Sequence, residues 1–485
     1  MSTELVFDRS MALLAAAERH IDAHLANYAE REDMAGTKLL LETLHKIVED
    51  ARREVVAVQR LLGEGAYKGK QLERQVRRVK NAARDTVRQT GEPLHYTTTP
   101  HGREFDPIAV AYGRMARQIE PRTELIFRGS EHRGYALSRP LLDNLTRNLV
   151  ARRSELAPQV KRLPTILYLQ YPAMEEGDVL QHLLIGHEVS HLALRRRPAG
   201  AKPSEEKASE AEVRFERALR ETRQPPPVQP GAKPNPRDRA LRWFTEIACD
   251  IMAVRLVGPG YYLALCEHAL VREWKYRASD SETSTHPHMA WRLTRAAGEL
   301  DRFVKKLKPP LRKEVRQLIR PFVDAVPDPT KEVEREAYAE TIDLALNQLV
   351  LDLDKDEAVK RAALSPEQLA AELPLVLERL QGHVAPAEQI EWPVEKVRGW
   401  TNEPGERPPR WSRPLDWRAI LNGGYLHLLK TAPSHPAPLR GAWDEADRRR
   451  REIIDHLRGT VELSEFQRAA ADVVKLRALE AEVAA

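Results

Sequence analysis

The sequence contains few cysteines, few aromatic residues and no long apolar run. Two of its 485 residues are cysteine and 6% are aromatic, whereas 31% are charged. The two cysteines cannot form the disulfide framework of a small secreted domain. No apolar run is long enough to span a bilayer, and the N-terminal segment MSTELVFDRS lacks the basic and apolar regions of a signal peptide. We therefore expect a protein of the reducing cytoplasm without a membrane span.

A strong charge of one sign and nucleotide-binding motifs are also lacking. The formal net charge is +5, and the basic residues are dispersed among acidic ones, so we do not expect nucleic acid as a partner. Neither a glycine-rich phosphate loop nor a dinucleotide-binding fingerprint is present, which argues against the common nucleotide-dependent enzymes. The abundance of arginine and alanine is typical of a GC-rich bacterial genome.

One segment that is present, residues 179–194, reads VLQHLLIGHEVSHLAL and contains an HExxH motif. Residues four apart share one face of a helix, so His187 and His191 can direct two imidazole nitrogens at one metal ion. Glu188, beside the first histidine, can reach a water molecule on that metal. This is the arrangement of zinc hydrolases. A short motif also arises by chance, and a buried histidine is often only a hydrogen-bonded core residue.

A second helix is predicted at 237–257, bounded by Pro236 and by Gly258-Pro259. Glu246 and Asp250 lie four residues apart on one face of this apolar helix, where unpaired carboxylates would be costly. A nearby metal ion would remove that cost, although a pair of acids at the helix rim is the simpler alternative. Combined with the motif, Glu246 would be the third ligand of a catalytic Zn²⁺. Asp250 would accept the free ring N–H of a ligating histidine.

Three motifs occur in one order: HEVSH, then EIACD, then THPHMAWR. This order resembles the HExxH…ExxxD…HP pattern of the gluzincin peptidases, typified by the CAAX prenyl proteases and the HtpX-like heat-shock proteases. The resemblance covers roughly residues 160–300 and implies a zincin-like α+β core that cleaves a protein or peptide substrate. It also implies that Glu246 is a zinc ligand, that Asp250 supports a histidine, and that His286 and Arg292 belong to the site. The chain departs from these relatives in lacking a membrane span or export signal, and in having Cys249 before the aspartate.

The mechanism implied is metal-assisted hydrolysis of a peptide bond. Zinc would lower the pKa of its water molecule toward about 7 and polarise the scissile carbonyl. Glu188 would accept the proton of that water and pass it to the leaving amine. His286, or less favourably Arg292, would stabilise the oxyanion. Alternatively, His286 caps a helix and Arg292 pairs with an acid.

A strand is predicted immediately before the motif helix, at 165–171 (TILYLQY), because the segment is β-branched and aromatic and lies between two prolines. As the edge of a sheet, it could bind the backbone of a peptide substrate by strand addition. Thr165, Leu167 and Leu169 would then be substrate-binding residues. An ordinary core strand is the alternative.

The fold expected from these patterns is mainly α with a small β-sheet, in three regions. Residues 1–100 form a helical, coiled-coil-like region that binds a regulatory partner or self-associates, or else a solvated helical hairpin. Residues 101–310 form the metallopeptidase domain, with a mobile insertion at about 196–236 that could gate the site, and residues 311–485 form a helical region. A competing hypothesis is a helical binding or scaffold protein whose zinc site is structural or degenerate. A nucleic-acid-associated factor using 70–88 and 448–451 is a third, less favoured hypothesis.

Overall fold

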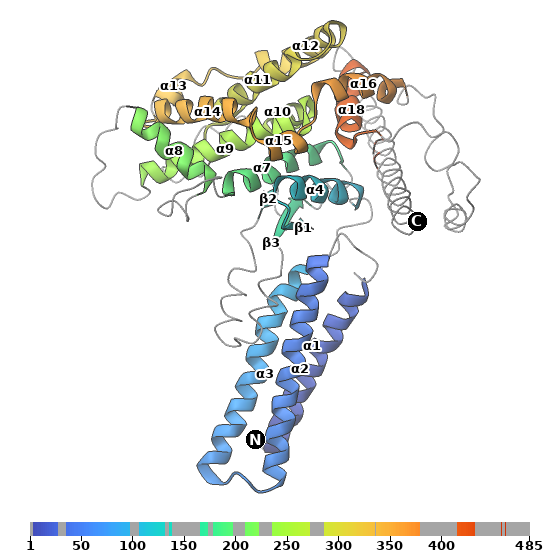
Figure 1. The fold of residues 1–485 in the computed structure, drawn as a ribbon, viewed down its shortest axis with the longest axis vertical. Coiled ribbons are helices and arrows are strands. Elements are labelled where there is room, and N and C mark those ends of the chain that lie inside the picture. The colour runs from blue at the N-terminus through green and yellow to red at the C-terminus, as the bar shows by residue number, and fades with distance from the viewer. Residues whose placement is uncertain are drawn as a thin grey trace, which may run out of the picture. The chain divides into compact units, whose positions relative to one another are not determined.

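The computed structural model describes residues 3–27, 35–97, 106–130, 135–137, 165–172, 178–196, 209–222, 235–271, 286–334, 336–378, 415–431, 457 and 461. Its fold is mainly α with a small β-sheet, which confirms the predicted class (Figure 1). The basic segment 448–451 lies outside the described residues. None of the described helices is both long and apolar enough to cross a membrane.

The chain divides into two compact units. One comprises Met1–Gly102 and Pro121–Ala173, and the other comprises Arg103–Glu120 and Met174–Ala485. This division differs from the three expected regions, because the strands group with the N-terminal helices and the C-terminal helices group with the motif helices. The physical reason in each case is a shared core, described below.

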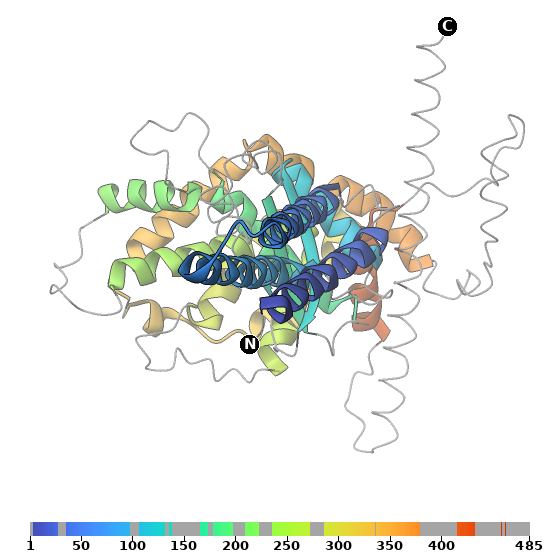
Figure 2. The ribbon, with the colours of Figure 1, turned by 90° about the horizontal axis from the view of Figure 1, so that it is seen from below.

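The first unit begins with three helices that pack side by side, α1 (Thr3–Asn27), α2 (Ala35–Gly63) and α3 (Gly69–Thr97) (Figure 2). The coiled-coil-like seam expected along α2 is buried, from Leu40 through Ile47 to Val58. α2 ends at Gly63, and Gly65 in the turn that follows adopts a positive φ of 75°. α3 continues through Gly91 to Thr97. One interior glycine costs a helix only about 1 kcal/mol, which the packing of α3 on α1 and α2 can offset.

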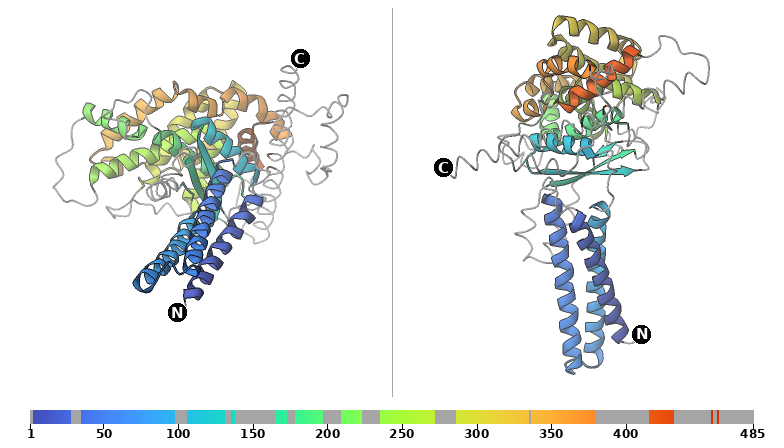
Figure 3. Two further views of the ribbon diagram at one scale, coloured as in Figure 1. Left: turned by 60° about the horizontal axis from the view of Figure 1, so that its bottom comes forward. Right: turned by 90° about the vertical axis from the view of Figure 1, so that its right-hand side faces the viewer.

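The three strands of the first unit form one mixed sheet in the order β1-β3-β2 (Figure 3). β1 (Thr123–Ser130) pairs in parallel with β3 (Thr165–Pro172), and β2 (Ala136–Leu137) pairs antiparallel with β3. Ile126, Ile166 and Tyr168 belong to the same buried cluster as the seam of α2. A sheet that shares its core with the N-terminal helices cannot be assigned to a separate region.

The pairing of β3 shows its place in the sheet, and the hydrogen bonds of Glu124 show its role at the start of α2. β3 is the central strand, so β2 occupies one of its edges at Leu169 and Gln170. Leu167 and Leu169 are buried, as expected of a core strand, whereas Thr165 is exposed. Among the described strands, β3 lies between β1 and β2 and is not the edge strand that strand addition was expected to use. The buried Glu124 carboxylate of β1 accepts the backbone N–H groups of Gly36 and Thr37, both at 2.8 Å. It therefore caps the start of α2, where the helix dipole favours a negative charge.

The second unit contains a larger set of helices. They are α4 (Asp106–Ile119), η5 (Gln181–Leu184), α7 (Ile185–Arg195), α8 (Glu210–Glu221), α9 (Pro236–Val257), α10 (Pro259–Val271), α11 (Met289–Lys305), α12 (Pro309–Asp324), α13 (Thr330–Glu334), α14 (Ala339–Leu353), α15 (Glu357–Ala362), α16 (Pro366–Glu378) and α18 (Trp417–Thr431). α9 lies at the centre and packs against α7, α11 and α14. The helical region expected from residue 311 onward contains several separate helices, because short turns interrupt the described residues at 336–338 and 354–356.

The helix α8 lies within the expected insertion at 196–236. Ser209 caps it through a capping box with Glu212, and Phe215 and Ala218 are fully buried. α8 packs on α14 and α9. The part of the insertion that the structure describes is therefore a packed helix and not an exposed loop.

The junction between α9 and α10 is held by α18 from the C-terminal region. Gly258 adopts a φ of 88° at the end of α9, where a Cβ atom would lie 2.9 Å from Leu364. The buried Asn422 amide donates to the carbonyl of Val257 at 2.7 Å and accepts the backbone N–H of Gly260 at 2.6 Å. These polar contacts place the C-terminal helices in the same unit as the motif helices.

Candidate metal centre

The HExxH motif lies on a helix, as its spacing predicts. α7 begins at Ile185, after the short 3₁₀ helix η5, and its residues from Ile185 to Leu194 are all buried. Gly186 lets α7 approach α9 closely, because a Cβ atom there would lie 3.1 Å from a methyl group of Val257. The glycine beside the motif therefore sets the distance between the two helices that carry the candidate ligands.

The structure brings His187, His191 and Glu246 together from α7 and α9. Both histidines are buried, and their ring centroids lie 5.0 Å apart with the planes nearly perpendicular. The Glu246 carboxylate spans the two rings: Oε2 lies 3.2 Å from His187 Nε2, and Oε1 lies 3.7 Å from His191 Nε2. Two segments 55 positions apart in sequence thus meet at one point.

Asp250 lies behind His187 and is completely buried. His187 Nδ1 lies 2.8 Å from Asp250 Oδ1, so the other ring nitrogen, Nε2, faces Glu246. Arg292 on α11 donates to both Asp250 oxygens, at 2.7 and 2.9 Å. Tyr261 on α10 donates its hydroxyl to Oδ1 at 2.5 Å. The carboxylate is therefore held from three helices.

Sequence reasoning placed Asp250 and Arg292 in the site but missed Tyr261. The available signal was weak: a tyrosine that follows the Gly-Pro end of the second motif helix by two residues. A bend there returns the chain alongside α9, and this return brings a hydroxyl back toward position 250.

The charges of the site are strongly coupled. Desolvation would lower the pKa of His187, but the Asp250 and Glu246 carboxylates raise it to about 10. Desolvation and the charge of His187 together lower the pKa of His191 to about 3. Desolvation would raise the pKa of Glu246, but His187 lowers it to about 2. Without a metal ion, the site thus pairs one imidazolium with two carboxylates and leaves the second imidazole neutral.

Cys249 is a further neighbour that sequence reasoning took only for a tolerated replacement. Its Sγ lies 3.2 Å from His191 Nδ1, on the side of the ring away from Glu246. Burial raises the pKa of this thiol well above its usual range. Among the described residues, ligand atoms of His187, His191 and Cys249 lie within 4.8 Å of one another, so this trio could also hold a metal ion.

The two remaining candidates have different surroundings. His286 Nε2 lies 3.4 Å from Glu246 Oε2, and its side chain is 58% exposed. The residue that caps α11 is His288, whose Nδ1 accepts the backbone N–H of Ala290 at 3.3 Å. Arg292 pairs with Asp250, as the alternative interpretation held, and its guanidinium therefore supports the site from behind. Glu188 is buried on α7 beside His187.

A zinc ion fits the residues present. Glu246 Oε2 is buried, and no hydrogen bond of good geometry reaches it from the described residues, although His187 Nε2 lies 3.2 Å away. A buried carboxylate of this kind needs a compensating cation. The His187 imidazolium supplies it in the metal-free site, and a zinc ion would take over that role once His187 loses its proton to bind the metal. Two imidazoles and one carboxylate are also a donor set that catalytic zinc uses.

Comparisons with family models, with curated proteins and with solved structures found no match. The interpretation of this site therefore depends on the side chains themselves and on their distances.

Proposed function

We propose that this protein is a zinc-dependent metallopeptidase that hydrolyses peptide bonds in a protein or peptide substrate. His187, His191 and Glu246 would hold the metal ion. The observation that supports this most directly is the position of the Glu246 carboxylate between the two motif histidines, with Oε2 3.2 Å from His187 Nε2 and Oε1 3.7 Å from His191 Nε2. Glu188 supports an enzyme over a structural site, because a structural metal needs no adjacent carboxylate.

Each residue of the site has its own role in the proposed reaction. A zinc ion bound here would supply Lewis-acid activation of a water molecule and of the scissile carbonyl. Glu188 accepts the proton of the attacking water and returns it to the leaving amine. His286, which is exposed beside Glu246, donates a hydrogen bond to the oxygen that becomes negative. Asp250, held by Arg292 and Tyr261, orients His187.

The decisive experiment compares the wild-type protein with Glu188→Gln. We expect both to bind zinc equally, as measured by metal analysis after dialysis. Loss of a general base typically costs about 10²–10⁴-fold in rate, so cleavage of a denatured protein mixture should fall by this factor. Equal cleavage by the two proteins would refute Glu188 as the base, and absence of bound zinc in both would refute the metal site.

The second candidate function is a binding or scaffold protein with a structural metal site. The observation that favours it is the proximity of Cys249 to the two histidines, since cysteine and histidine are common ligands of structural zinc. Cys249→Ala discriminates the two. A peptidase that uses Glu246 should keep its zinc, whereas a site that uses the thiolate should lose it. With Glu246→Gln, a peptidase site should lose its zinc, whereas a site that uses the Cys249 thiolate should keep it.

A further inference from the structure

The solvent-facing side of α3 carries a row of five cations, interrupted once by an asparagine. The row consists of Lys70, Arg74, Arg77, Asn81, Arg84 and Arg88. Successive members are three or four residues apart, and all six are exposed. With 3.6 residues per turn, they fall within a sector of roughly 80°. We call this surface the α3 row.

The bundle fixes the direction in which the α3 row points. Val79, Ala83 and Thr86 are buried, and their positions lie on the opposite side of the same helix. Val79 and Ala83 belong to the buried cluster that α3 shares with α1 and α2, and the three helices lie side by side (Figure 3). The cations therefore cannot turn inward unless the bundle unfolds.

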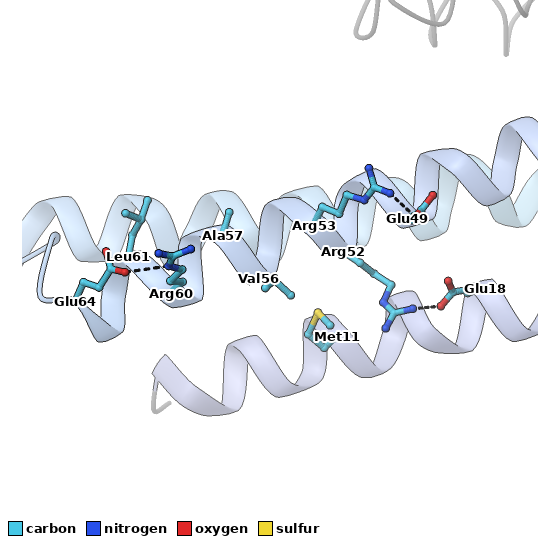
Figure 4. A pocket seen from close by; sticks show the side chains of 10 residues that line it. All are labelled: Met11, Glu18, Glu49, Arg52, Arg53, Val56, Ala57, Arg60, Leu61 and Glu64. Atoms are coloured by element: carbon cyan, nitrogen blue, oxygen red, sulfur yellow. Dashed lines mark hydrogen bonds and ion pairs between the residues drawn. The ribbon is translucent and has the colours of Figure 1, made fainter.

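The three arginines of the neighbouring helix α2 are paired, whereas the cations of the α3 row are not. Figure 4 shows that Arg52, Arg53 and Arg60 of α2 each meet a glutamate. On α3, Arg78, which lies outside the row, pairs with Glu54 at 2.7 Å. None of the five cations of the row forms an ion pair with a described residue. Among the described residues, the row is thus a positive surface that no acidic side chain neutralises.

The concentration of charge is large relative to the whole chain. Residues 70–88 contain seven lysines and arginines but only two acidic residues, whereas the net charge of all 485 residues is +5. The sequence already marks 70–88 as a basic segment, although the basic residues of the whole chain are dispersed among acidic ones. Folding gathers those of the segment, because a helical period of 3.6 aligns side chains that alternate with other residues along the chain.

We propose that the α3 row binds the phosphate backbone of a nucleic-acid duplex without sequence preference. The row runs from Lys70 to Arg88, and these 88 − 70 = 18 steps rise about 27 Å at 1.5 Å per residue. Duplex DNA presents a negative charge about every 1.7 Å of its axis, so a rigid row of this length can contact several phosphates at once. Four of the five cations are arginines, whose planar forks suit phosphate oxygens.

Other polyanions fit the row less well. Membrane insertion requires an exposed apolar face beside the cations, but the apolar face of α3 is buried in the bundle. Single strands are usually held by aromatic side chains that stack on unpaired bases, and the row has none. Binding to a duplex backbone requires only aligned positive charge, which the row provides.

The test is a titration of the full-length protein against a short fluorescein-labelled DNA duplex of random sequence, followed by anisotropy over a range of salt concentrations. With five phosphate contacts, the slope of log K against log salt should be about −4.5. Binding should then weaken about 500-fold between 50 and 200 mM salt. The triple substitution Arg74→Gln, Arg77→Gln, Arg84→Gln should reduce the slope to about −1.8.

The matched control is Arg53→Gln with Arg60→Gln, which removes two exposed but paired arginines from the same bundle. It should leave the slope unchanged. Circular dichroism must show all variants folded, which is expected because glutamine and arginine have similar helix propensities. Stronger binding to anionic lipid vesicles or to polyglutamate than to the duplex would overturn the proposal. An unchanged slope in the triple variant would overturn it as well.

Discussion

The hydroxyl of Tyr261 donates a hydrogen bond to Asp250 Oδ1 at 2.5 Å, and both side chains are completely buried. Asp250 is a residue of α9, and Tyr261 lies on α10, beyond the bend at Gly258. The carboxylate that orients His187 is thus itself oriented by the helix that follows. The motifs place Asp250 and Arg292 in the site, but they pass over Tyr261 on the helix between them.

Replacing Tyr261 with phenylalanine should weaken metal binding without removing a ligand. Loss of a hydrogen bond to a charged group costs about 1.5–3 kcal/mol, and disturbed partners of ligating histidines typically reduce metal affinity about 10–100-fold. A competition titration with a chromophoric zinc chelator measures the affinity. The control is Tyr262→Phe, whose hydroxyl lies beside Cys266, and which should bind zinc as the wild type does. Equal affinities for both variants would contradict a positioning role.

Replacing Arg292 with methionine should destabilise the fold strongly. The guanidinium makes two hydrogen bonds to the buried Asp250, and removal of one partner of a buried pair costs about 3–5 kcal/mol. Urea denaturation measures the free energy of unfolding. The double variant Arg292→Met, Asp250→Asn should recover part of this loss, because no unpaired charge remains. The exposed pair of Arg320 and Asp324 supplies a control, since Arg320→Met should cost less than about 1 kcal/mol.

Replacing Asn422 with alanine should loosen the junction of α9 and α10. The side chain satisfies the carbonyl of Val257 and the N–H of Gly260, and each buried group left unsatisfied costs about 1–3 kcal/mol. We expect a fall in unfolding free energy of about 2–4 kcal/mol in urea denaturation. Gln317→Ala on the exposed face of α12 should have almost no effect. A similarly small effect for Asn422→Ala would show that α18 does not hold the junction.

The charge of Asp356 should contribute to stability in a pH-dependent way. Asp356 caps α15 by accepting the N–H groups of Ala358 and Val359, and it pairs with Arg196. Desolvation opposes the charged form, but the Val359 N–H and the Arg196 guanidinium lower the pKa of this carboxyl overall.

Because the folded-state pKa is lowered, the contribution of Asp356 is complete above the unfolded value of about 3.9. It is lost as the pH falls through the lower folded-state value. Asp356→Asn keeps a good capping residue but removes the charge. Its stability deficit, about 0.5–1 kcal/mol at pH 7, should shrink in urea denaturation as the pH falls below about 4. A deficit that stayed constant down to the lowest accessible pH would contradict the assignment.

The sequence by itself determined what depends on neighbouring residues along one segment. His187 and His191 are four residues apart, so they lie on the same face of their helix wherever that helix packs. Pro236 and Gly258 bound α9, and the β-branched run at 165–171 forms a strand, because these preferences arise within a few residues. The class of fold and the positions 187, 191, 246 and 250 could be predicted for this reason.

Only the tertiary structure decided which segments share a core and what stands behind each ligand. The contact of Cys249 with His191, the hydrogen bond of Tyr261 and the placement of β3 at the centre of its sheet all depend on how helices and strands pack. Asn422 reaches Gly260 across 162 positions. A pattern within one segment carries no information on such pairs, because their meeting is set by the summed burial of many apolar side chains along several helices.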